Sequence, residues 1–268
     1  MSAYLRHFDL TEAPFSKEIA DEDLWLPPSK TELVAELEEA MNERASVVLV
    51  GEPGVGKTSV LRAMRARLSS SSFRLTYCHN ATLGKRDFYR QLCIALGLRP
   101  AANAGGLFSA ISSHVEELAR ERQTPVFLLD EAHLMQQDLL NNLHILLNYE
   151  WDSKALLSLV MVGLPELQDR LRLRHNRSLY TRIHYRLHVG STTVEDTEAY
   201  LLYRLKRADC DRPIFADDAV AMLHEAAGSC LREVDRVATA CLKGASRRKK
   251  KLVDRAIVAS IAALPDDD

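Results

Sequence analysis

Residues 46–58 read Ser46-Val47-Val48-Leu49-Val50-Gly51-Glu52-Pro53-Gly54-Val55-Gly56-Lys57-Thr58. The second part of this stretch, from Gly51 to Thr58, matches the phosphate-loop pattern G-x-x-x-x-G-K-[ST] over its full length. An apolar run enters the loop, and a segment with helical spacing leaves it at Ser59. Strand, glycine loop and helix in this order form the setting in which the pattern binds phosphate, so a chance glycine turn is the poorer interpretation.

The loop residues have expected roles around a bound triphosphate. Glycines let the backbone turn its N–H groups toward phosphate oxygens, and the positive N-terminus of the next helix faces the same anion. We expect Lys57 to reach the β- and γ-phosphates of ATP, and the hydroxyl of Thr58 to bind Mg²⁺. The residues expected to bind nucleotide are Gly51, Glu52, Pro53, Gly54, Val55, Gly56, Lys57, Thr58 and Ser59.

The composition indicates a protein with a large core and no global charge bias. Of the 268 residues 47% are hydrophobic and the formal net charge is −2, so any nucleic-acid surface must be local. The first residues lack the apolar segment of a secretory signal, and no apolar run reaches membrane-spanning length. The five cysteines form no C-x-x-C pair, which is typical of a reducing compartment. We expect a cytoplasmic protein without membrane contact.

Five strand-like runs alternate with segments of helical spacing, which predicts an α/β fold with a parallel sheet. The middle runs are continuous and apolar, as in strands that are covered on both faces. The five runs are Val47–Val50, Arg74–Cys78, Val126–Leu129, Leu157–Val162 and Tyr185–Val189.

The pattern changes after Gly190, where helical segments follow one another with few strand signals. These segments are Thr193–Ala208, Asp217–Ala227, Arg232–Lys249 and Val253–Leu264. We expect an α/β nucleotide-binding domain at residues 1–190, with an ordered N-terminal arm at 1–28, and an all-α lid domain at residues 191–268. Nucleotide would bind between the two domains.

Two carboxylates, Asp130 and Glu131, follow the third predicted strand, at the edge where α/β sheets bind nucleotides. We expect Asp130 to hold Mg²⁺, directly or through water, and Glu131 to orient and deprotonate the attacking water. An acidic strand end alone is common, but here a phosphate loop precedes it. The residues Asp130-Glu131-Ala132-His133 also spell a DEAH box. A helicase of that kind needs a second motor domain, so we expect His133 to be a neighbour of the site.

Two arginines are candidates for stabilising charge during phosphoryl transfer. Arg182 lies just before the last predicted strand, and Arg232 begins a helix after Gly228-Ser229-Cys230-Leu231. A surface ion pair is the simpler interpretation of each, and position alone does not decide between the two.

The phosphate loop, the acidic strand end, the helical lid and the late arginines together resemble an AAA+ ATPase. Finer similarity to the general-secretion ATPase A and transposition-ATPase group covers nearly the whole chain. It is carried by Tyr4-Leu5, Phe8, Glu12-Ala13-Pro14-Phe15, Leu146-Leu147-Asn148-Tyr149-Glu150 and Val162-Gly163-Leu164-Pro165-Glu166-Leu167. Within that group, the chain is most similar to the stand-alone ATPases that accompany DNA transposases.

The resemblance implies roles for particular residues. Gly51–Thr58 matches Walker A, and Asp130-Glu131 matches Walker B. Arg182 matches the arginine finger, which acts on the ATP of a neighbouring subunit, although Arg177 and Arg186 are close enough to compete for that role. The lid arginine called sensor 2 is matched by Arg232.

The chain departs from the group at the position of sensor 1. The group usually carries Gly-Gln-Pro-Glu-Leu after the fourth strand, and here Leu164 replaces the glutamine. Ser158 is the one polar residue on the predicted strand Leu157–Val162. The identity of a sensor 1 residue therefore stays open.

A basic run near the C-terminus, Arg247, Arg248, Lys249, Lys250 and Lys251, is the candidate DNA contact. A second basic stretch runs from Arg170 to Arg177. The alternative for the first run is a solvated helix end, because cations are favoured at helix C-termini. A ring or helical filament of subunits would multiply a few cations per subunit along double-stranded DNA.

These features favour an ATPase that oligomerises on DNA and regulates transposition by recruiting or activating a transposase. The alternatives are a secretion-type ATPase and a nucleotide-dependent protein adaptor without DNA binding. Secretion-type relatives usually continue into a membrane segment and a cell-wall-binding part, which we do not find in these 268 residues. We find no motif for the acceptor pocket of a small-molecule kinase.

Overall fold

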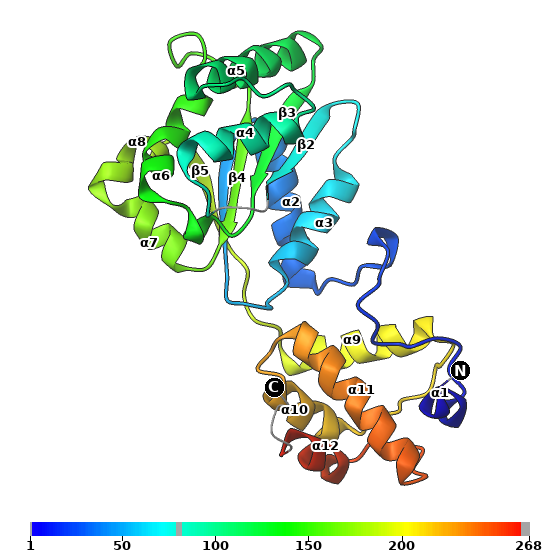
Figure 1. Ribbon diagram of the computed structural model, residues 1–268. Coiled ribbons are helices and arrows are strands. Elements are labelled where there is room, and N and C mark those ends of the chain that lie inside the picture. Colours follow the sequence, from blue (N-terminus) through cyan, green and yellow to red (C-terminus); the bar gives the residue numbers. More distant parts are fainter. Residues whose placement is uncertain (1, 79–81, 264–268) are drawn as a thin grey trace. The chain divides into compact units, whose positions relative to one another are not determined.

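The computed structural model describes residues 2–78 and 82–263, which divide into two compact units. Among these described residues, an α/β unit comprises 28–52, 57–78 and 82–189, and a helical unit comprises 2–27, 53–56 and 190–263. Figure 1 shows the elements of each unit along the chain. None of the described helices has both the length and the apolar composition needed to cross a bilayer.

The α/β unit is built on a sheet of five parallel strands in the order β2-β3-β4-β1-β5. The strands are β1 (Ser46–Val50), β2 (Phe73–Cys78), β3 (Thr124–Leu129), β4 (Ser158–Gly163) and β5 (Ile183–His188). All five predicted strands are present, with boundaries within two residues. The predicted α/β fold with a parallel sheet and C-terminal helices is confirmed.

Helices cover both faces of the sheet, which explains why β1, β3 and β4 are buried along their whole length and apolar after their first residue. Figure 1 shows α2 (Pro28–Asn42) and α3 (Lys57–Arg67) on one face, and α4 (Lys85–Ala95) and α5 (Ala104–Arg120) on the other. Alternate strand residues such as Val48, Phe127 and Met161 share one core with α4 and α5.

Short helices follow β3 and β4 on the face of α4 and α5, where Leu139, Leu143 and Leu167 join the same core. They are η2 (Ala132–Leu134), α6 (Gln137–Leu143), η3 (His144–Leu147), α7 (Glu166–Arg172), η4 (Arg174–Asn176) and α8 (Arg177–Tyr180). They bring the residues after β3 close to the end of β4.

The helical unit contains α9 (Val194–Arg207), α10 (Asp217–Ala226), α11 (Leu231–Arg247) and α12 (Arg255–Ala262). These are the four predicted helices, with slightly different ends, and the predicted last residue, Leu264, lies outside the described residues. Thr193 caps α9 by accepting from the N–H of Asp196, whose side chain accepts from the N–H of Thr193.

The N-terminal arm packs into the helical unit. It carries α1 (Ala3–Phe8) and η1 (Asp21–Asp23), and Phe8, Leu10 and Phe15 are buried in the same core as the lid helices. The buried guanidinium of Arg204 donates to the carbonyls of Pro14 and Ser16, at 2.6 Å each. The arm was expected to belong to the α/β domain, but aromatic anchors predict only that a segment packs and not what it packs against. The division into a nucleotide-binding domain at residues 1–190 and a lid domain at residues 191–268 remains a proposal.

Candidate nucleotide-binding site

The phosphate loop leaves the carboxyl end of β1 and ends where α3 begins at Lys57. Gly54 and Gly56 have φ angles of +77° and +97°, a left-handed backbone that glycine adopts without strain. A Cβ atom at Gly54 would also overlap Sγ of Cys230, which belongs to the same unit. These two positions therefore explain why the loop needs glycine.

The ammonium group of Lys57 lies over the start of the loop. Its Nζ donates to the carbonyls of Gly51 at 2.7 Å and Glu52 at 2.9 Å. Burial lowers the pKa of Lys57, and the nearby carboxylates of Glu131 and Asp130 oppose this shift. The structure therefore brings the lysine and both predicted carboxylates to the same edge of the sheet.

Asp130 follows the last residue of β3 and is held by two hydrogen bonds. The hydroxyl of Tyr77 donates to Oδ2 at 2.6 Å, and the N–H of Glu131 donates to Oδ1 at 2.9 Å. Burial, followed by this hydrogen bond to Asp130, raises the pKa of Tyr77. No sequence pattern points to Tyr77 as a site residue, because its contact with Asp130 depends on how β2 pairs with β3.

Oxygen atoms of Thr58 and Asp130 supply the donors that Mg²⁺ prefers. Thr58 is exposed in the first turn of α3, and each carboxylate oxygen of Asp130 keeps a free lone pair beside its hydrogen bond. These residues fit Mg²⁺ bound through one protein hydroxyl, a carboxylate and water. Bound Mg²⁺ would neutralise phosphate charge at this edge.

Ser158 does not lie at this edge. It is the first residue of β4 and pairs in register with Val126, near the amino end of β3. In a parallel sheet the amino and carboxyl ends of strands lie at opposite edges. Ser158 is therefore remote from Asp130 and Glu131.

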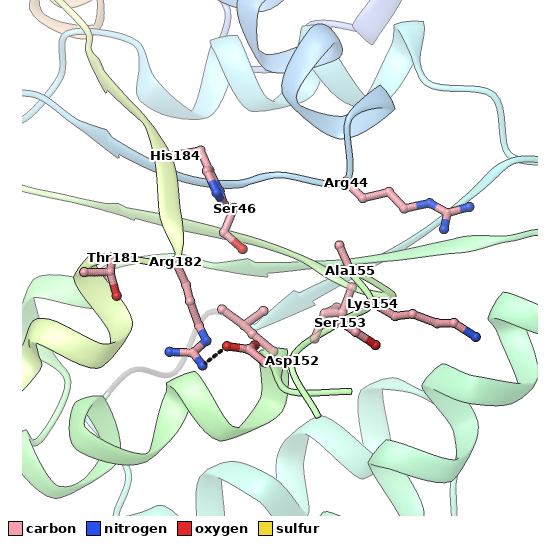
Figure 2. Close-up of a pocket in the computed structure, with 11 residues that line it drawn as sticks. Arg44, Ser46, Asp152, Ser153, Lys154, Ala155, Thr181, Arg182 and His184 are labelled. Atoms are coloured by element: carbon pink, nitrogen blue, oxygen red, sulfur yellow. Dashed lines mark hydrogen bonds and ion pairs between the residues drawn. The ribbon is translucent and has the colours of Figure 1, made fainter. Parts of the chain in front are cut away.

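Arg182 lies at the amino edge of the sheet, immediately before β5. Its Nη2 forms an ion pair with Oδ2 of Asp152 at 2.5 Å, and its Nη1 donates to the carbonyl of Ser178 at 2.9 Å. Figure 2 shows Arg182 and Asp152 pointing toward each other. Together with Arg44 and His184 they line a cavity of about 360 Å³. No sequence pattern points to Asp152 as the partner of Arg182.

The two competing arginines differ in their surroundings. Arg186 stacks over the ring of Tyr180, 4.1 Å from its centroid, and donates to the Tyr180 carbonyl at 3.1 Å. Arg177 is exposed, and its side chain forms no hydrogen bond or ion pair with the described residues. In the helical unit, Arg232 is likewise exposed near the start of α11, with no side-chain partner among the described residues.

Much of the basic run after α11 is occupied by internal contacts. Lys250 pairs with Asp254 at 2.5 Å, Lys251 contacts the carbonyl of His7 and the carboxylate of Asp9, and Arg248 donates to Ser260 at 3.0 Å. In the described part of the chain, Arg247 and Lys249 are exposed without an ion pair. In the second basic stretch, Arg174, His175 and Arg177 are exposed in the same way.

The fold is shared with solved structures of low sequence identity. Cdc6p of Pyrobaculum aerophilum matches with a TM-score of 0.70 and 16% identity, over 90% of this chain and 67% of that chain. The Orc1 protein of Aeropyrum pernix, solved in complex with DNA, matches with a TM-score of 0.63 and 22% identity, over 90% of this chain and 66% of that chain. At such identities these matches establish the fold.

Two matches at the level of sequence identify relatives of this chain, and not only its fold. General secretion pathway protein A of Aeromonas hydrophila is 33% identical over 248 residues, which are 91% of this chain and 45% of that protein. The chain thus spans less than half the length of this relative. A profile of the AAA domain matches residues 30–171, from the first turn of α2 into the last turn of α7. Since that match extends over more than half of the sequence, the chain belongs to the AAA domain family of P-loop ATPases.

Proposed function

We propose that this ATPase is an assembly switch: subunits associate when ATP is bound and separate after hydrolysis. Lys57 and Thr58 would hold ATP·Mg²⁺ with Asp130, and Glu131 would activate water. Arg182 of one subunit would reach the triphosphate bound by the next, and Arg232 would sense nucleotide from the lid. The nucleotide then decides which assembly is stable.

The observation that carries this proposal is the position of Arg182 relative to the phosphate loop. β1 and β5 are parallel, with Ser46 opposite Ile183 and Val50 opposite His188. The loop follows Val50, whereas Arg182 precedes Ile183, so the two lie beyond opposite ends of the paired strands. Four residue steps along β1 span about 13 Å. Because Arg182 lies at the edge opposite the phosphate loop of its own subunit, it would serve phosphoryl transfer by contacting the nucleotide of another subunit.

The similarity to General secretion pathway protein A supports a role for this switch in secretion. The name of that protein places it in general secretion, and its similarity extends over 91% of this chain. We propose that this chain drives the assembly of a secretion-associated complex through nucleotide-dependent contacts between proteins. This favours the secretion alternative over the transposase-associated role that the sequence analysis put first.

DNA binding is the second candidate, and exposed cations favour it. Arg174, His175 and Arg177 lie in or beside η4, and Arg247 and Lys249 lie at the end of α11. Side chains without internal ion partners are available to neutralise phosphates. An oligomer on duplex DNA that recruits a transposase would use these residues.

Mixing two inactive variants tests the trans action of Arg182. Lys57→Ala subunits bind no nucleotide but supply Arg182, whereas Arg182→Ala subunits bind ATP but lack the arginine. We expect the mixture to recover a measurable part of wild-type hydrolysis, because mixed interfaces contain one complete site. A mixture no more active than the sum of its components would contradict the proposal. The control is a mixture of Lys57→Ala with Glu131→Gln subunits. In that mixture every site that can bind ATP lacks the base, so hydrolysis should not recover.

A further inference from the structure

We propose that His133 is the positioning residue that couples Glu131 to the phosphate loop. This inference rests on the proposed role of Glu131 as the base of ATP hydrolysis. His133 lies in η2, and its side chain is 8% exposed. Its imidazole Nδ1 has two neighbours from different elements, the N–H of Leu164 at 3.4 Å and Oε2 of Glu131 at 3.5 Å.

The surroundings of His133 hold its backbone against the end of β4. Arg170 donates from Nη1 to the carbonyl of His133 and from Nη2 to the carbonyl of Met135. A Cβ atom at Gly163 would lie 3.1 Å from the backbone nitrogen of His133 and 3.2 Å from its Nδ1. The ring therefore packs directly on the last residue of β4, at a site where a side chain would be crowded.

The end of β4 in turn contacts the phosphate loop. The N–H of Gly51, the first residue of the loop, donates to the carbonyl of Gly163 at 3.2 Å. A displacement of the loop at Gly51 thus reaches Glu131 through β4 and one imidazole ring. The side chain of Leu164 is apolar and cannot itself hydrogen-bond to Glu131. At the end of β4, the imidazole of His133 therefore supplies the polar group that faces Glu131.

A single nitrogen atom cannot serve both neighbours in the same way. Unprotonated Nδ1 accepts from the N–H of Leu164 and leaves the carboxylate of Glu131 free to accept a proton from water. In the tautomer that carries its hydrogen on Nδ1, the ring donates to Glu131 and gives up the contact with Leu164. The position of the hydrogen on His133 therefore decides which of the two contacts Nδ1 makes.

Substitutions of His133 in the full chain test this role by steady-state ATP hydrolysis. His133→Ala and His133→Gln should lower kcat about tenfold with little change in the KM for ATP, because a misplaced base slows chemistry more than binding. His133→Asn should stay within about threefold of wild type, because an amide at the place of Nδ1 offers an oxygen to Leu164 and an N–H to Glu131. In a Glu131→Gln background, His133→Ala should cost nothing further.

His114→Ala is the matched control. His114 forms the same kind of pair in α5, with Nδ1 3.5 Å from Oε2 of Glu117. Two results would overturn the inference: His133→Ala as active as His114→Ala, or His133→Asn as slow as His133→Gln.

Amide hydrogen exchange tests the contact without reference to activity. The N–H of Leu164 should exchange faster in His133→Ala than in His114→Ala, and equal rates would overturn the inference. If Glu131→Gln hydrolyses ATP at the wild-type rate, the proposed base is wrong, and exchange at Leu164 still decides whether the contact with His133 exists.

Discussion

The guanidinium of Arg182 is bound to the carboxylate of Asp152 within the same subunit, with Nη2 2.5 Å from Oδ2. The pair is partly exposed: 24% of the Arg182 side chain and 51% of the Asp152 side chain are accessible. An ion pair in such a setting contributes little to stability and opens readily. In the proposed assembly, Arg182 would meet the nucleotide of another subunit only after leaving Asp152, so this pair would compete with assembly.

Asp152→Asn should raise hydrolysis by assembled subunits about threefold, because it removes the charge that competes for Arg182. Asparagine tolerates the left-handed backbone at this position, where φ is 66°. The measurement is the hydrolysis rate as a function of protein concentration. Asp169→Asn, which removes the carboxylate 3.4 Å from Arg172, is the control. A rate at or below that of the control would contradict the competition.

Arg182→Ala should lower the hydrolysis rate at high protein concentration about a thousandfold, the usual contribution of an arginine finger, and leave ATP affinity nearly unchanged. Arg186→Ala should lower it far less, because Arg186 is engaged with Tyr180. The measurements are turnover and nucleotide affinity of each variant and of Arg177→Ala. A larger reduction in Arg177→Ala or Arg186→Ala would move the finger role to that residue.

The sequence predicts those parts of the fold and site that depend on local patterns. Apolar runs such as Val126–Leu129 predict strands, because burial on both faces leaves no polar alternation. The spacing from Gly51 to Thr58 predicts the loop, because few backbones follow such a glycine pattern. Asp130 and Glu131 could be predicted as site residues because they come directly after a strand.

Contacts between residues far apart in the sequence could not be predicted in this way. Tyr77 meets Asp130 across 53 residues, and Asp152 meets Arg182 across 30. The first contact depends on the register of β2 against β3, which opposes Tyr77 to Leu128. The second depends on a turn in which Glu150, Trp151 and Asp152 all have positive φ. No local pattern encodes either arrangement, and the same holds for the packing of the N-terminal arm.

Arg174→Ala combined with Arg177→Ala should weaken binding to duplex DNA about tenfold if these cations neutralise phosphates. It should also reduce the slope of log affinity against log salt by about two, because each of the two arginines would otherwise neutralise one phosphate. Fluorescence anisotropy with a labelled duplex at two or more salt concentrations measures both quantities. The control removes the same charge elsewhere, with Arg67→Ala and Arg120→Ala. Equal affinities of the two double variants would argue against this surface.

Asp235→Asn should flatten the pH dependence of stability in the helical unit. Burial raises the pKa of Asp235 to about 6, against hydrogen bonding from Tyr200 and the charge of Arg204. The folded state thus binds more protons than the unfolded state between about pH 4 and 6, and stability falls as pH rises through this range. Two pKa units correspond to about 3 kcal/mol.

Thermal melting between pH 4 and 7 checks this expectation. Trp25 packs on Tyr200, with ring centroids 5.5 Å apart, so its fluorescence reports on the surroundings of Asp235. Asparagine can still accept from the hydroxyl of Tyr200, which donates to Asp235 at 2.7 Å. Asp211→Asn, at an exposed loop position, should retain the wild-type pH profile. An unchanged profile in Asp235→Asn would contradict the shifted pKa.

The size distribution of Glu131→Gln with saturating ATP and Mg²⁺ tests the central claim most directly. This variant should bind ATP without hydrolysing it, so mass photometry should find oligomers when ATP is present. It should find monomers when nucleotide is left out. It should also find monomers for the double variant Lys57→Ala/Glu131→Gln, which cannot bind ATP. Strictly monomeric Glu131→Gln at saturating ATP, with duplex DNA also present, would contradict an assembly held together by nucleotide.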